Sequence, residues 1–182
     1  MQVISSSPLR VPSIAFVTMG CAKNEVDSNE MKQRLSNARY HIALTPDHAD
    51  AIIVNTCSFI QSATEESIAA IFDVLGLSSV KQGSIPVIVS GCMPARYGDD
   101  LAQSIEEVAA FVPCEQEKDI VAVVDRLLHV DHTMFPLEPL SDSDEADYDT
   151  SGSDASEHSI SAYVKISDGC DRFCSYCEIP YI

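Results

Sequence analysis

Three cysteines near the carboxyl end of this 182-residue sequence are spaced closely enough to bind one metal centre. These closing cysteines, Cys170, Cys174 and Cys177, lie in GCDRFCSYCEIPYI with Tyr176 before the last of them. Structural zinc sites generally use four ligands, whereas the spacing here is C-x3-C-x2-C without a neighbouring histidine. Three thiolates on a four-iron cluster leave one iron open to a cofactor or substrate. The pattern favours an iron-sulfur cluster, with zinc as the alternative.

Three further cysteines, here called the sheet-edge cysteines, each follow an apolar, strand-like run. Cys21 follows SIAFVTM, Cys57 follows AIIVN and Cys92 follows PVIVS. Because loops at the carboxyl ends of parallel strands converge, these thiols could face one another and hold a second iron-sulfur cluster. A single cysteine after a strand is more often a small buried residue, so the inference depends on three equivalent positions. Cys114 follows a fourth run, farther from the trio, and is interpreted as a bystander.

The apolar runs alternate with helical patterns, which predicts a doubly wound, flavodoxin-like α/β fold with a parallel sheet. The predicted strands span residues 13–19, 51–55, 86–90 and 109–113. In a flavodoxin-like order of 2-1-3-4, the second, first and third of these strands lie side by side. That order would bring the sheet-edge cysteines together.

Two of the predicted helices have clear apolar faces. In the helix after the second run, Ser62 and Glu65 fit a capping box, and Gly76 can end the helix. Its apolar face comprises Ile68, Ile71, Phe72 and Leu75. The helix after the fourth run, which is expected to end near Asp131, has its apolar side at Ile120, Val123, Val124, Leu127 and Leu128.

Polar residues near the thiols give weaker signals. Asn24 or Asp27 is predicted to cap the helix after Cys21, with Lys23 in the same turn. Arg96, in the loop after Cys92, is equally compatible with a position near the cluster and with a solvated surface. No side chain is predicted to be a catalytic acid, base or nucleophile.

The composition changes sharply after residue 140. Residues 141–157, SDSDEADYDTSGSDASE, hold seven acids and no lysine or arginine, which is typical of a flexible linker. SAYVKIS at 161–167 is predicted to form a strand that leads into the closing cysteines. We therefore expect a domain over 1–140, a linker over 141–159 and the start of a second domain over 160–182.

The overall charge and the cysteine count restrict the functional class. The formal net charge is −17, from 28 acidic and 11 basic residues, so this chain should repel a phosphate backbone. The amino-terminal stretch matches neither a secretory signal nor a membrane span, so we expect a cytoplasmic protein. Seven cysteines in a reducing compartment favour metal or redox chemistry over disulfides.

The sequence resembles a known family, the radical S-adenosylmethionine enzymes, whose cluster motif has the spacing of the closing cysteines. Within them it resembles the methylthiotransferases, through GCAKNEVDS, VNTCSFIQSATEESI, SGCMPAR and KISDGCDRFCSYCEIP in that order. The resemblance implies two [4Fe-4S] clusters. One would be bound by Cys21, Cys57 and Cys92, and the other, with S-adenosyl-L-methionine and adjacent Tyr176, by Cys170, Cys174 and Cys177.

The family divides by substrate. One branch methylthiolates a tRNA adenosine beside the anticodon, and the other methylthiolates the β-carbon of an aspartate in ribosomal small-subunit protein twelve. Residues 22–24, Ala-Lys-Asn, and residues 58–60, Ser-Phe-Ile, resemble the ribosomal protein branch. That protein is therefore the expected substrate, and a flavodoxin or ferredoxin is the expected electron donor. The tRNA branch remains the alternative.

The same resemblance bears on the extent of the chain. Family members continue after the closing cysteines into a partial barrel, so this chain is expected to be an amino-terminal fragment that is inactive alone. A function of another class is a further alternative, namely that of a non-catalytic flavodoxin-like module with a zinc knuckle.

Overall fold

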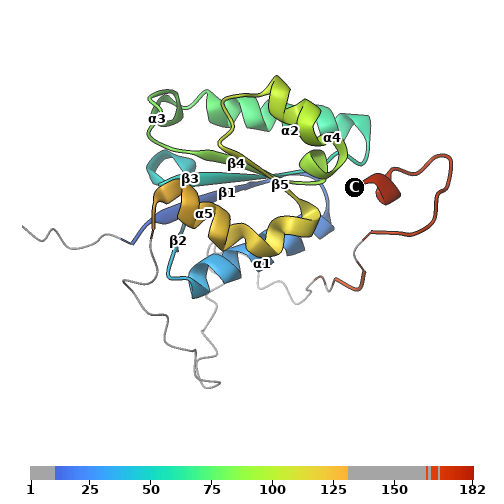
Figure 1. Cartoon of the computed structure of the whole chain (residues 1–182), viewed down its shortest axis with the longest axis horizontal. Coiled ribbons are helices and arrows are strands. Elements are labelled where there is room, and N and C mark those ends of the chain that lie inside the picture. The colour runs from blue at the N-terminus through green and yellow to red at the C-terminus, as the bar shows by residue number, and fades with distance from the viewer. Residues whose placement is uncertain (1–10, 131–162, 164, 168) are drawn as a thin grey trace, which may run out of the picture.

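The computed structural model describes residues 11–130, 163, 165–167 and 169–182 (Figure 1). Its centre is a parallel sheet with the order β2-β1-β3-β4-β5. The strands are β1 (Ser13–Thr18), β2 (His41–Ala43), β3 (Ala51–Thr56), β4 (Val87–Gly91) and β5 (Ala110–Pro113). The predicted doubly wound, flavodoxin-like α/β fold is confirmed.

The strand order differs from the predicted one in a specific way. The prediction placed the strand at 13–19 between the strands at 51–55 and 86–90, but in the structure β3 lies between β1 and β4. Val54 pairs with Val17 on one side and with Val89 on the other. The outer position beside β1 belongs to β2, a three-residue strand that is too short to produce a recognisable sequence pattern.

Helices cover both faces of the sheet (Figure 1). The α-helices are α1 (Ala22–Asn37), α2 (Gln61–Leu75), α3 (Ser78–Lys81), α4 (Cys92–Ser104) and α5 (Ile120–Leu128), and the 3-10 helices are η1 (Pro46–His48), η2 (Cys114–Asp119) and η4 (Ile179–Tyr181). α1 and α5 pack on one face through residues such as Leu35 and Val124. α2 and α4 pack on the other through Ile71 and Leu101.

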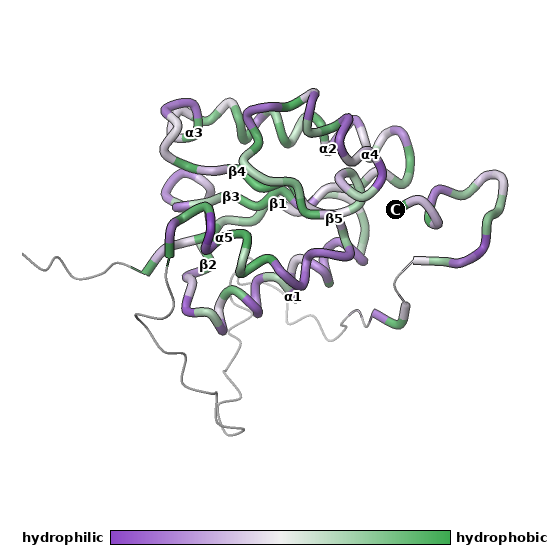
Figure 2. The backbone as a smooth tube through the Cα atoms, in the orientation of Figure 1, coloured by the Kyte–Doolittle hydropathy of each residue, from purple (hydrophilic) through white to green (hydrophobic). Residues whose placement is uncertain are grey.

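β3 forms the middle of the core, and every one of its residues is buried. Ile52 and Val54 point into the α2 and α4 side, while Ala51 and Ile53 point into the α1 and α5 side, as the alternation of side chains along a strand requires. In Figure 2 much of the central strands is green, that is hydrophobic, as is much of α5. This explains why β3 reads as a continuous apolar run in the sequence.

The helix predictions were partly wrong in their details. α2 begins at Gln61, with Ile60 as its N-cap and no capping hydrogen bond from a side chain, so Ser62 and Glu65 do not form a capping box. Its buried side is centred on Ile71 and Val74 instead, and Phe72 is 54% exposed. The predicted helix end at Gly76 is confirmed. α5 ends at Leu128, slightly before the predicted position.

The predicted strand at 161–167 is not seen at the residues that can be described there. Residues 163 and 165–167 are not in a strand, and none of the described strands pairs with them. A strand needs a hydrogen-bonded neighbour, which explains the difference. The linker predicted at 141–159 lies outside the described residues. Over the described ranges, the helices are too short or too polar to cross a membrane.

Candidate metal centre

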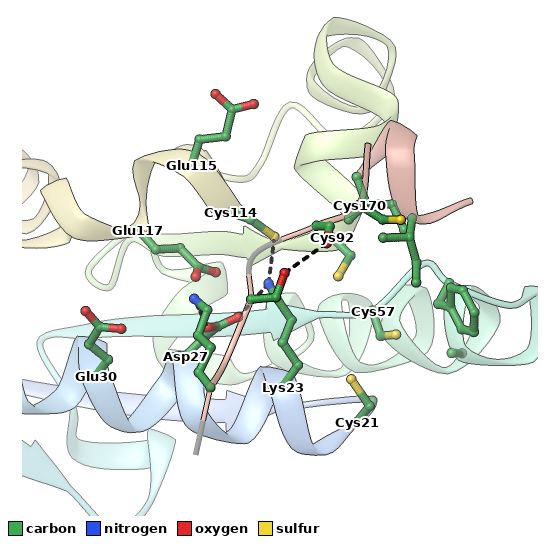
Figure 3. A pocket seen from close by; sticks show the side chains of 18 of the residues that line it. Cys21, Lys23, Asp27, Glu30, Cys57, Cys92, Cys114, Glu115, Glu117 and Cys170 are labelled. Carbon is green, nitrogen blue, oxygen red and sulfur yellow. Dashed lines mark hydrogen bonds and ion pairs between the residues drawn. The ribbon is translucent and has the colours of Figure 1, made fainter. Parts of the chain in front are cut away.

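The sheet-edge cysteines lie at the carboxyl edge of the sheet, each on a different connection (Figure 3). Cys21 is the N-cap of α1 after β1, Cys57 directly follows β3, and Cys92 is the first residue of α4 after β4. Cys57 and Cys92 are buried, and Cys21 is exposed. All three line one open cavity of about 1560 Å³. Neighbouring strands therefore deliver three thiols to a common space.

Asn24 joins two of these thiols to the sheet. Its Oδ1 lies 3.6 Å from the Sγ of Cys21 and 3.9 Å from the Sγ of Cys92, within range of weak S–H hydrogen bonds. Its Nδ2 donates to the backbone carbonyl of Thr56 at 2.8 Å. Asn24 is thus a buried bridge between α1 and β3. The prediction that Asn24 or Asp27 caps α1 was wrong, because Cys21 occupies the N-cap position.

Gly91 allows Cys92 to start α4 directly at the end of β4. Its φ is +96°, and a β-carbon there would lie 2.4 Å from Asn55 Oδ1 and 2.5 Å from the Thr56 carbonyl. Only glycine fits both the backbone conformation and the space. Gly91 is therefore required for the close approach of the end of β4 to β3, directly before Cys92.

The sheet-edge cysteines supply thiols, the ligand type that iron-sulfur clusters use. In the part of the chain that the structure describes, no group of three or more Cys, His, Asp or Glu side chains is close enough to hold one metal ion. Cys21, Cys57 and Cys92 line one open cavity, which is the arrangement that a cluster held by three cysteines would need.

A group of charged side chains lies beside the sheet-edge cysteines (Figure 3). Lys23 Nζ lies 2.7 Å from Asp27 Oδ2 and 3.5 Å from the Sγ of Cys114. Burial lowers the pKa of Lys23, but the hydrogen bond with Asp27 and nearby negative charge outweigh it and raise the pKa overall. Burial is the main cause that raises the pKa of Glu117 to about 8, and Glu117 Oε1 has no hydrogen-bond partner within the described structure.

Cys114, interpreted from the sequence as a bystander, lines the same cavity. A hydrogen bond between Cys114 and Cys92 lowers the pKa of Cys114 and, together with burial, raises the pKa of Cys92. Cys114 follows β5, the neighbour of β4, and this sequence position is the signal that could have placed it here.

The closing cysteines lie in the closing segment, defined as the described residues 163, 165–167 and 169–182. Cys170 lines the cavity shared with the sheet-edge cysteines. Cys174 and Cys177 are linked by a turn in which the Cys177 backbone N–H donates to the Cys174 carbonyl at 3.1 Å. Cys170 and Cys174 are exposed, and Tyr176 is 88% exposed. One of the closing cysteines, Cys170, therefore lies on the cavity of the sheet-edge set.

Arg96 lies within α4 and not in a loop, and its guanidinium has protein partners, so it is not simply solvated. One of its guanidinium nitrogens donates to the Ser58 carbonyl at 2.6 Å, and another pairs with Glu178 at 3.2 Å. It joins α4 to the loop after Cys57 and to the closing segment.

These observations define a class of molecule: a doubly wound α/β domain whose sheet edge gathers cysteines from neighbouring strands. A comparison with models of protein families identifies the family of this chain. Residues 13–113, more than half of the chain, match the model described as "Uncharacterized protein family UPF0004", and the chain belongs to that family.

Named relatives agree on one description, "Ribosomal protein uS12 methylthiotransferase RimO". The chain is 35% identical to the Natranaerobius thermophilus protein over 181 residues, covering 93% of this chain and 37% of the relative. It is 37% identical to the Campylobacter fetus protein over 170 residues, covering 93% of this chain and 36% of the relative. The chain thus spans little more than a third of these relatives. The resemblance to the ribosomal protein branch is confirmed.

Proposed function

We propose that this chain supplies the cluster-binding part of an enzyme that methylthiolates the β-carbon of an aspartate in ribosomal protein uS12. The proposed cofactors are two [4Fe-4S] clusters and S-adenosyl-L-methionine. The main support is the placement of Cys21, Cys57 and Cys92 around one cavity that Cys170 also lines. The names of the relatives support the choice of substrate.

The two sets of thiols would have different tasks. The sheet-edge cysteines would hold one cluster, with Asn24 orienting two of the thiols and the ammonium of Lys23 offsetting thiolate charge. The closing cysteines would hold the other and leave one iron open to the cofactor beside Tyr176. When bound, these groups supply the radical chemistry that a β-carbon requires, because no ordinary side-chain base removes its hydrogen at neutral pH.

We assign residues 1–140 to the domain with the sheet-edge cysteines, 141–159 to an acidic linker, and 160–182 to the start of the domain that binds S-adenosyl-L-methionine. We place the reaction in the cytoplasm, with a flavodoxin or ferredoxin as electron donor. The charge of −17 argues against direct nucleic-acid binding by this chain. We expect no turnover from the 182 residues alone.

A chimera tests the proposed function. The chain is joined at Ile182 to the part of the Natranaerobius thermophilus relative that follows its matched region, and is reconstituted anaerobically with iron and sulfide. It is then incubated with uS12, S-adenosyl-L-methionine and a reductant. Mass spectrometry should find one methylthio group in place of hydrogen on an aspartate, and Cys21→Ala should abolish it.

Two outcomes of this experiment contradict the proposal. Modification of a tRNA adenosine, with uS12 unchanged, would support the tRNA branch instead. Colourless protein that retains zinc and no iron would support a non-catalytic module with a zinc knuckle, because iron-sulfur protein is brown.

A further inference from the structure

Two ion pairs join the closing segment to the sheet domain, one on each side of the closing cysteines. Lys165 Nζ lies 2.8 Å from Asp27 Oδ1, and Glu178 Oε2 lies 3.2 Å from a guanidinium nitrogen of Arg96. Lys165 precedes the closing cysteines and Glu178 directly follows the last of them. The segment is therefore held at both ends of its ligand loop.

The first pair involves a deeply buried carboxylate. The Asp27 side chain is only 2% exposed, and each of its oxygens contacts one lysine, Lys23 on the same helix and Lys165 on the closing segment. If Lys165 undocks, this buried carboxylate keeps its contact with Lys23 but loses the cation at its other oxygen, which is costly at a site with so little access to water. Asp27 therefore favours the state in which Lys165 is docked.

The second pair starts from the elements that carry the sheet-edge cysteines. Arg96 belongs to α4, which begins at Cys92, and it also donates to the carbonyl of Ser58, the residue after Cys57. Another nitrogen of the same guanidinium forms the ion pair with Glu178. The guanidinium fork thus couples two sheet-edge connections to the residue that follows Cys177.

We propose that Asp27 and Arg96 are positioning residues that dock the closing cysteines against the sheet-edge cysteines. They fix the position of the closing cysteines relative to the sheet-edge cysteines through Lys165 and Glu178. The docking depends on ion pairs between protein groups and needs no bound cluster. It therefore holds or fails independently of the proposed methylthio transfer, which it would serve by keeping the two sets of thiols on one cavity.

Tryptic cleavage of the unmodified, cluster-free chain under reducing conditions measures the docking. Trypsin must draw the Lys165 side chain into its own pocket, so cleavage after Lys165 requires that the pair with Asp27 opens. In Asp27→Asn, cleavage after Lys165 should be faster by about tenfold or more, because a buried pair is replaced by a neutral contact. Peptide mass spectrometry gives the rate at this bond.

Matched variants separate docking from general loosening. Glu30→Gln removes the exposed pair of Glu30 with Arg34 on the same helix and should leave the rate after Lys165 unchanged. Glu178→Gln changes a partly exposed side chain and should raise the rate by about twofold to fivefold. Circular dichroism checks that each variant is folded.

The outcomes are decisive in either direction. Faster cleavage after Lys165 in folded Asp27→Asn supports the docking. If Asp27→Asn does not fold, Glu178→Gln decides alone. An unchanged rate in every folded variant other than Glu30→Gln overturns the proposal.

Discussion

Gly20 packs directly against Cys57: a β-carbon at position 20 would lie 2.4 Å from the Cβ of Cys57 and 3.0 Å from its Sγ. Gly20 has a φ of +96°, a backbone conformation that residues with a β-carbon rarely adopt. The connection after β1 therefore passes the connection after β3 at a distance that only glycine permits. This contact brings the loop of Cys21 next to Cys57.

The first prediction concerns this contact. Gly20→Ala should lower the free energy of unfolding by the backbone cost, about 1–2 kcal/mol, and by about 1–3 kcal/mol more for overpacking against Cys57. Urea unfolding measures the loss. Gly83→Ala is the matched control, because Gly83 has a φ of +71° and a β-carbon added there would meet nothing within 4 Å, so only the backbone cost applies. Equal losses in the two variants would contradict the close approach.

The second prediction concerns Asn24, whose amide links α1 to β3. Asn24→Ala leaves the Thr56 carbonyl without its side-chain donor in a buried setting, which should cost roughly 1–3 kcal/mol of unfolding free energy. Asn37→Ala, at an exposed position in the same helix, should change it by less than about 0.5 kcal/mol. An Asn24→Ala chain as stable as Asn37→Ala would show that the bridge is not structural.

The sequence was most informative where the structure is local. The run AIIVN predicts β3 because a strand buried on both faces is apolar throughout, and the place of each sheet-edge cysteine follows from the strand before it. The sequence did not predict β2, because a strand of three residues is too short to show an alternation of apolar and polar residues. The strand order was wrong because pairing is decided by contacts far apart in the sequence.

The residues around the thiols could not be predicted for the same reason. Asn24 looks like a helix cap until the first turn of α1 is seen to pack against β3. Asp27 is a common helix residue, and its second partner, Lys165, is 138 positions away. No short pattern contains such a pair.

The third prediction concerns the pH dependence of stability that arises from Glu117. Burial, followed by the negative charges of Cys114 and Asp27, raises the pKa of Glu117 to about 8, whereas the pKa of an unfolded glutamate is about 4.3. Between these values the folded chain binds more protons than the unfolded chain. The contribution of Glu117 to stability is therefore present below about pH 4.3 and is lost as the pH rises through about 8.

Glu117→Gln tests this, because it keeps the shape and removes the titration. Relative to the unchanged chain, the unfolding free energy of the variant should increase with pH, with a gain on the order of a few kcal/mol near pH 8. Urea unfolding at about pH 5 and about pH 8 measures the two differences. Parallel curves for the two proteins would exclude Glu117 as the source.

The last prediction is that the two sets of cysteines retain iron unequally. Two of the sheet-edge cysteines, Cys57 and Cys92, are buried at strand ends, whereas Cys170 and Cys174 are exposed on a segment that two ion pairs join to the sheet domain. Because solvent exposure promotes cluster loss, replacing Cys21, Cys57 and Cys92 together by alanine should remove most of the iron that survives anaerobic reconstitution and desalting. Replacing the closing cysteines should remove little, and Cys114→Ala, which changes no proposed ligand, should retain the full amount. Iron and sulfide analysis per chain gives these values. If the closing cysteines instead held most of the iron, the sheet edge would not be the more stable cluster site.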